Sequence, residues 1–234
     1  DDVALYYARH PSDLAGADAV ILPGSKNTTE DLLFLRENGW PQALCDFMAQ
    51  KKPVIGICGG YQMMGEAVCD PERTESDIGR VEGLHLLGVT TTFVSRKLTS
   101  QVTADCRELP FLGETLSIPD LSGYEIHMGR TESGGDDVYP FIVTGRAGQP
   151  CQSPAGAARK DGLAWGTYIH GLFDNDEFRR QFLNGLRKQK GWDALPVTRH
   201  YRQEKEAKYD RLARIVRQSL DMKRLRQIME EGIQ

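Results

Sequence analysis

The sequence lacks a long hydrophobic run. None of its apolar stretches approaches the roughly 20 residues that a transmembrane helix needs. The first ten residues, DDVALYYARH, also lack the basic and apolar segments of a secretory signal peptide. We therefore expect a cytoplasmic protein that does not contact a membrane. Because the chain begins at Asp1 rather than at Met, we also expect it to be part of a longer protein.

Paired cysteines are missing as well. The five cysteines (Cys45, Cys58, Cys69, Cys106 and Cys151) contain no C-x-x-C pair, and an odd number cannot form a complete set of disulfides. This usage is typical of a protein kept in a reducing compartment. It again favours the cytoplasm.

A strong charge of either sign is also absent. The 29 Lys and Arg residues against 33 Asp and Glu residues give a net charge of −4, so neither nucleic acid nor an acidic membrane is expected as the main partner. The phosphate-binding pattern G-x-x-x-x-G-K-[ST] does not occur. These absences favour a small-molecule substrate and give no signal for nucleotide binding.

What the sequence does contain is an alternation of short β-rich runs and helical patterns. ADAVILPG and VIGI predict strands, and each is followed by a helical segment, the first beginning at Asn27. After Met64, the segments GLHLLGVTTTFV, GYEIHMGRTE, PFIVTGR and GLAWGTYIH predict further strands. This order predicts an α/β fold with a mixed, largely parallel central sheet flanked by helices.

The last part of the chain has a different character. Residues 196–234 form a long amphipathic helical pattern with ten Lys or Arg residues against six Asp or Glu residues. We predict one domain over residues 1–195 and a C-terminal helical extension over 196–234. The extension is interpreted as a surface helix packed by its apolar stripe, and a docking element for a partner domain is the alternative.

The stretch VIGICGG has the form of a nucleophile elbow, in which a reactive side chain lies on a sharp strand-to-helix turn. Glycines on both sides of Cys58 would permit the turn. At a helix N-terminus the pKa of the thiol is expected below its free value of about 8.5, and the N–H of Gly59 could stabilise an oxyanion. The alternative is a buried structural cysteine.

A nucleophilic thiol needs a base, and the chain offers five histidines. His170 closes the strand-like segment GLAWGTYIH and precedes Gly171, so it is expected at the end of a sheet, where a base can reach a nucleophile. His127, in GYEIHMGRT, is the competing candidate. We favour His170.

Several segments together resemble one family: the class I (triad-type) glutamine amidotransferase domain at the C-terminus of cobyric acid synthases. They are ADAVILPGSKNTTEDL, KPVIGICGGYQMMGEAVCDP, GLHLLGVTTTF, GYEIHMGRTE and DGLAWGTYIHGLFDNDEFRR, in the order of the family. The resemblance implies a flavodoxin-like fold that hydrolyses glutamine to glutamate and ammonia. It implies Cys58 as the nucleophile and His170 as the general base.

The same resemblance implies the other parts of a glutamine site. The backbone N–H groups of Gly24 or Ser25 would complete an oxyanion hole with Gly59. Gln62 would face the glutamine substrate. Arg130 could hold the substrate α-carboxylate in a bidentate manner, and a surface ion pair is the alternative interpretation of this residue.

The usual position of a third catalytic residue has no carboxylate in this sequence. Many enzymes of this class carry a carboxylate two residues after the histidine, but Leu172 occupies that position. Glu125 and Asp174 are candidates to orient His170. Without a carboxylate, a backbone carbonyl would have to fix the imidazole tautomer.

The resemblance also implies partners. In the family, an N-terminal synthetase domain, absent from this chain, uses ATP and Mg²⁺ to amidate positions b, d, e and g of cobyrinic acid a,c-diamide in cobalamin biosynthesis. No cofactor or metal is expected in the present domain. The alternatives are the amidotransferase domain of cobyrinic acid a,c-diamide synthase, a related glutaminase subunit, a cysteine hydrolase of similar fold, and a non-catalytic scaffold.

Overall fold

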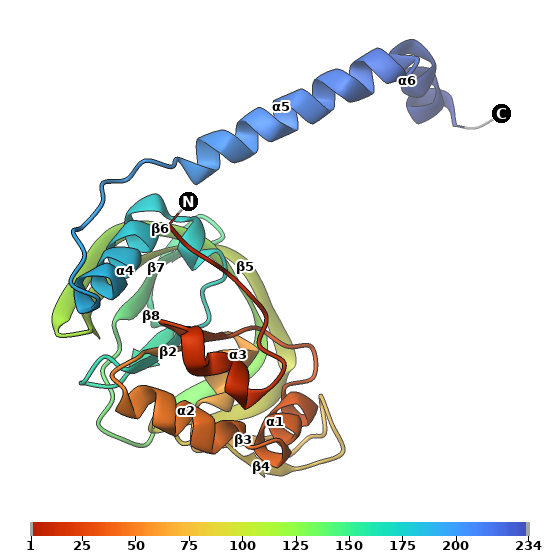
Figure 1. Cartoon of the computed structure of the whole chain (residues 1–234). Helices are drawn as coiled ribbons and strands as arrows, with labels where there is room; N and C mark the ends of the chain where they lie inside the picture. Colours follow the sequence, from red (N-terminus) through yellow and green to blue (C-terminus); the bar gives the residue numbers. More distant parts are fainter. Residues whose placement is uncertain (1, 233–234) are drawn as a thin grey trace. The chain divides into compact units, whose positions relative to one another are not determined.

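The computed structural model describes residues 2–232. They divide into two compact units, the first ending at Leu195 and the second beginning at Pro196 (Figure 1). The first unit contains two sheets and the candidate site. Its helices are α1 (Thr28–Glu37), α2 (Trp40–Ala49), α3 (Gly59–Met63) and α4 (Asp176–Gln189), with 3₁₀ turns at Pro11–Gly16 and Leu172–Asp174. Helix α1 begins where the sequence predicts, because Asn27 caps it by accepting the N–H of Glu30 at 3.1 Å.

The first sheet has four strands in the order β1-β2-β10-β9. They are β1 (Val20–Leu22), β2 (Val54–Ile57), β10 (Ala164–Thr167) and β9 (Gly156–Ala158). Strands β1, β2 and β10 are parallel, whereas β9 is antiparallel to β10. The carboxyl ends of β2 and β10 therefore meet at one edge, which is where open α/β sheets place their ligands.

Both faces of this sheet are covered. Val54 and Ala164 pack in a core with residues of α1 and α2, whereas their neighbours Ile55 and Trp165 pack in a second core with residues of α4. Successive residues of a strand point to opposite faces, so the two cores lie on opposite sides of the sheet. Figure 1 shows α2 and α4 on either side of β2. The predicted α/β class is confirmed.

The second sheet has six strands and is mainly antiparallel. Its path is β4-β3-β5-β7-β8, with β6 also paired to β5. The strands are β3 (Ala67–Cys69), β4 (Arg80–Glu82), β5 (Val89–Phe111), β6 (Glu114–Ser133), β7 (Phe141–Arg146) and β8 (Gln149–Pro154). Only β3 and β5 are parallel in it.

The first sheet is the mixed, largely parallel sheet that the sequence predicts, and the remaining strands form the second sheet. The antiparallel pairing of β5 with β6 has a local cause. Strands β5 and β6 are joined by two residues, Leu112 and Gly113, both with positive φ (52° and 83°). A two-residue turn of this kind forces an antiparallel hairpin.

The second unit consists of α5 (Tyr201–Ser219) and α6 (Met222–Glu231). Asp221 caps α6 by accepting the N–H of Arg224 at 2.9 Å. The apolar residues Leu212, Ile215, Val216 and Leu220 follow one another at helical spacing in and just after α5, as the predicted amphipathic pattern requires.

Candidate active site around Cys58

Cys58 lies on a sharp turn between a strand and a helix. Strand β2 ends just before it, α3 begins just after it, and its own backbone has φ +52° and ψ −110°. A positive φ is costly for a residue with a side chain and is typically found at functional sites. The turn packs closely because Gly60 has no side chain: a Cβ there would lie 1.9 Å from the Leu22 carbonyl oxygen. The elbow predicted from the glycine pattern is present.

The Cys58 side chain is buried and hydrogen-bonded as a thiol. Its Sγ donates to the carbonyl oxygen of Ile126 in β6 at 3.3 Å. Burial raises the pKa of the thiol above its usual value, and the opposing effect of the Gly59 N–H is smaller. The prediction of a lowered pKa is therefore wrong for this structure, because loss of hydration outweighs the start of a helix that is only five residues long. A base is needed to remove the proton.

The side chains of His170 and Cys58 both lie next to Gly24. A Cβ placed on Gly24 would lie 3.4 Å from His170 Cε1 and 3.6 Å from Cys58 Cβ, so the two side chains face the same backbone segment. Burial, and next the charge of His127, lower the pKa of His170. A lowered pKa keeps the imidazole neutral at neutral pH, which is the form that accepts a proton.

Two backbone amides adjoin the nucleophile. A Cβ placed on Gly59 would lie 2.8 Å from the backbone nitrogen of Ser25, so the Gly59 and Ser25 amides are neighbours beside Cys58. The segment that carries Ser25 is held by its own side chain, which donates to Asp31 Oδ2 at 2.5 Å and accepts the Asn27 N–H at 3.0 Å. Adjacent N–H groups beside a nucleophile are suited to stabilise an oxyanion.

Gln62 has protein partners. It is buried, its Nε2 donates to the Tyr168 hydroxyl at 3.2 Å, and its Oε1 accepts from the Thr28 hydroxyl at 3.4 Å. The Tyr168 hydroxyl lies 2.5 Å from the Thr131 hydroxyl. The structure therefore differs from the expectation that Gln62 faces the substrate, since both ends of its amide are occupied inside the protein.

Arg130 also differs from its expected role. Its Nε donates to Glu132 Oε1 at 3.1 Å, and both side chains are mostly exposed. The structure gives Arg130 the surface ion pair that was the alternative interpretation.

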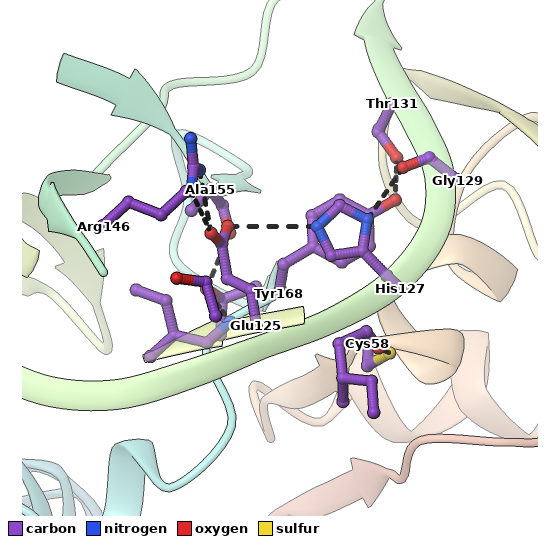
Figure 2. Close-up of polar contacts among 12 residues, drawn as sticks. Cys58, Glu125, His127, Gly129, Thr131, Arg146, Ala155 and Tyr168 are labelled. Atoms are coloured by element: carbon purple, nitrogen blue, oxygen red, sulfur yellow. Dashed lines mark hydrogen bonds and ion pairs between the residues drawn. The ribbon is translucent and has the colours of Figure 1, made fainter. Parts of the chain in front are cut away.

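A buried ionic cluster lies close to the nucleophile (Figure 2). Arg146 donates through two nitrogens to Glu125 Oε2, at 3.0 and 2.8 Å, and the Glu125 side chain is only 3% exposed. Glu125 Oε1 lies 3.9 Å from His127 Nε2, while His127 Nδ1 donates to the Gly129 carbonyl oxygen at 2.9 Å. The His127 ring stacks on Tyr168 with centroids 3.8 Å apart. The Glu125 carboxylate thus interacts with Arg146 and His127.

Neither predicted third residue bonds to the base. Within residues 2–232, no hydrogen bond or ion pair joins Glu125 or Asp174 to the His170 ring, and His170 Nε2 is buried without a hydrogen-bond partner. Asp174 lies near the turn at Gly171, to whose carbonyl its N–H donates at 2.9 Å. The structure brings together Cys58 and His170, but not a carboxylate.

The sequence reasoning missed Arg146 and Tyr124. Arg146 lies in β7, 21 residues from Glu125. The two residues come together because β6 and β7 both pair with β5. Tyr124 stacks on His170 and pairs with its backbone. The segment GYEIHMGRTE gave a signal for this region, but not for the contact between Tyr124 and His170.

The described residues lack two further kinds of feature. Across residues 2–232, no group of three or more His, Cys, Asp or Glu side chains could hold a metal ion. No helix in the same range is long and apolar enough to span a membrane.

Comparison with known proteins places this geometry in a family. Residues 1–178 match the CobB/CobQ-like glutamine amidotransferase domain. The chain is 47% identical to a cobyric acid synthase of Syntrophobacter fumaroxidans, over 97% of this chain and 45% of the relative. It is 41% identical to one of a Thermoanaerobacter species, with the same coverage. The chain thus spans about half the length of the curated relatives that it matches.

Solved structures agree at the level of the fold. A glutamine amidotransferase crystal structure is 17% identical with a TM-score of 0.50, over 76% of this chain and 84% of that chain. PurLQS from Thermotoga maritima is 16% identical with a TM-score of 0.52, over 74% and 82%. These neighbours support the class I amidotransferase fold. Since the family match extends over most of the first unit, this chain belongs to the CobB/CobQ-like glutamine amidotransferase domain family.

Proposed function

We propose that this chain hydrolyses glutamine and supplies the ammonia to a synthetase that amidates positions b, d, e and g of cobyrinic acid a,c-diamide. The observation that carries the proposal is that the side chains of Cys58 and His170 both lie next to Gly24. Cys58 is on the strand-to-helix turn, beside the backbone amides of Gly59 and Ser25. The names of the relatives, which are cobyric acid synthases, favour this corrinoid over other acceptors.

The geometry supports a two-step mechanism. His170 takes the proton of Cys58, and the resulting thiolate attacks the side-chain amide carbon of glutamine. The negative charge that develops on the amide oxygen is stabilised by the N–H groups of Gly59 and Ser25. His170 then returns the proton to the leaving nitrogen, and ammonia departs from a thioester. Water, deprotonated by His170, hydrolyses the thioester to glutamate and restores the thiol.

The substrate and partner assignments follow from this scheme. Gln62 acts indirectly. Its side-chain amide donates a hydrogen bond to the Tyr168 hydroxyl, and the Tyr168 ring stacks on His127. ATP and Mg²⁺ serve the synthetase, which binds the corrinoid, because amide formation from a carboxylate requires activation. Hydrolysis through a thioester needs only the side chains and backbone amides of this chain, together with water. We infer a cytoplasmic location, which the five free cysteines favour.

Transfer of a labelled nitrogen tests the proposal. The chain is combined with the synthetase half of the Syntrophobacter fumaroxidans relative, ATP, Mg²⁺, cobyrinic acid a,c-diamide and glutamine labelled with ¹⁵N in its side chain. We expect ¹⁵N in the corrinoid amides, detected by mass spectrometry. Free ammonium chloride serves as the control nitrogen source. Amidation with ammonium but not with glutamine would contradict the proposal.

The charge of His127 gives a prediction about pH dependence. Burial, followed by His127, lowers the pKa of His170, so the change His127→Gln should raise that pKa. Because the base must be neutral, the acidic limb of kcat/KM for glutamine should move to higher pH. His85→Gln, at an exposed histidine paired with Glu66, is the matched control and should leave the limb in place. A limb that stays fixed or moves to lower pH in His127→Gln would refute this electrostatic coupling.

A further inference from the structure

We propose that Tyr124 is a positioning residue for His170, which it holds by ring stacking where triad enzymes use a carboxylate. The inference rests on the proposed function of the same site. Its starting point is that His170, within the described residues, has no hydrogen-bonded carboxylate. An imidazole that exchanges protons with Cys58 still needs a fixed orientation, because catalysis depends on the alignment of the reacting atoms.

The two rings are nearly parallel and close. Their centroids lie 4.8 Å apart and their planes differ by 9°. This is the geometry of a stacked aromatic pair. Turning the imidazole edge-on would break the overlap, so the stack resists rotation of the His170 ring about its Cβ–Cγ bond.

The backbone enforces this stack. The Tyr124 N–H donates to the His170 carbonyl at 3.2 Å, and the His170 N–H donates to the Tyr124 carbonyl at 2.8 Å. Residues that exchange both hydrogen bonds lie directly opposite each other in an antiparallel pair, so their side chains point to the same face. Gly123 permits this approach, because a Cβ there would lie 2.4 Å from the His170 carbonyl oxygen.

The strand that carries Tyr124 is fixed on both sides. Before it, the Ser122 N–H donates to Asn175 Oδ1 at 2.8 Å, and Asn175 Nδ2 donates back to the Ser122 carbonyl at 3.0 Å. After it, Glu125 is anchored by Arg146. The next residue of the strand, Ile126, accepts the thiol of Cys58. One short segment of β6 therefore contacts both the nucleophile and the base.

The stack also suits the charge that appears during the reaction. His170 becomes an imidazolium once it has accepted the thiol proton, and the face of an aromatic ring attracts a cation. The ring face supplies this attraction without the phenolic hydroxyl. Phenylalanine should therefore replace tyrosine here, whereas an aliphatic residue should not.

The test compares Tyr124→Phe and Tyr124→Leu in the nitrogen-transfer mixture described above. The Tyr124 side chain is 47% exposed, so both variants should fold. We expect Tyr124→Leu to lower kcat for glutamine hydrolysis about tenfold with little change in KM, the loss typical of a misaligned catalytic group. Tyr124→Phe should stay within about twofold of wild type, because it keeps the stacked ring. Tyr139→Leu, at another exposed tyrosine (37%), is the matched control.

A spectroscopic readout separates positioning from general stability. In the wild type and Tyr124→Phe, the His170 Cε1 proton should show the ring-current shift of an overlying aromatic ring, and Tyr124→Leu should lose it. If the wild type is active and Tyr124→Leu has the same kcat, the positioning role would be overturned and the proposed function would stand. A wild type that releases no ammonia even with the synthetase would instead overturn the proposed function, and with it the catalytic meaning of the stack.

Discussion

Replacing Cys58 with alanine should lower glutamine hydrolysis by at least about 10³-fold, because no thioester can form without the sulfur. The substitution removes one atom from a buried position and leaves the elbow backbone in place, so the chain should still fold. Ammonia release in the presence of the synthetase measures the effect. Synthetase activity supplied with free ammonium should be unchanged.

The cysteine control for this experiment is Cys45→Ala. Cys45 is exposed in α2, on the helical cover of the first sheet, and its loss should leave ammonia release within about twofold of wild type, as for most surface substitutions. If Cys58→Ala retained activity comparable to that of Cys45→Ala, the assignment of the nucleophile would be wrong.

Replacing Glu125 with alanine should lower the free energy of unfolding by about 3–5 kcal/mol, the usual cost of removing one partner of a buried ion pair. The change leaves Arg146 without its carboxylate, and leaves His127 Nε2 without the nearby charge. The midpoint of urea unfolding, with the slope checked for constancy, measures the loss. Glu132→Ala breaks an exposed pair in the same strand and should cost only about 0–1 kcal/mol. Equal losses in the two variants would contradict the account of the cluster.

The stabilisation by Glu125 should also depend on pH. Burial, the largest single effect, raises the pKa of Glu125, but the nearby His127 and the hydrogen bonds and charge of Arg146 outweigh it, so that the net pKa is lowered. A carboxyl whose pKa is lower in the folded state stabilises the protein above the pKa of the unfolded state, and loses this effect as the pH falls through the folded pKa. The difference between wild type and Glu125→Ala should therefore shrink as the pH is lowered below the ordinary range of glutamate.

Local signals in the sequence were enough for β1, β2 and β10 of the first sheet, but not for β9. The cap at Asn27 and the glycines around Cys58 act within a few residues, so their patterns predict the start of α1 and the elbow. The long antiparallel pair of β5 and β6 could not be predicted in the same way. It depends on the two-residue turn at Leu112 and Gly113, where Leu112 has a positive φ that leucine seldom adopts.

The same distinction applies to the candidate site: residues in local motifs could be predicted, whereas contacts between distant segments could not. Cys58 and His170 were found from motifs at the ends of strands, and the parallel sheet brings those ends together. The raised pKa of Cys58 was predicted in the wrong direction, because it depends on burial by segments distant in sequence. The partners of Glu125 and His170 likewise come from strand pairing, since β6 and β7 both pair with β5 and Tyr124 pairs with His170, and no local pattern encodes these contacts.

Labelling with a glutamine-mimicking electrophile tests the central claim most directly. The chain and its His170→Ala variant would be incubated with 6-diazo-5-oxonorleucine, with and without the synthetase, and the adducts located by mass spectrometry. The account predicts one adduct, on Cys58, that forms more slowly in His170→Ala. Labelling spread over all five cysteines, or no adduct even with the synthetase present, would contradict a glutamine site built on Cys58 and His170.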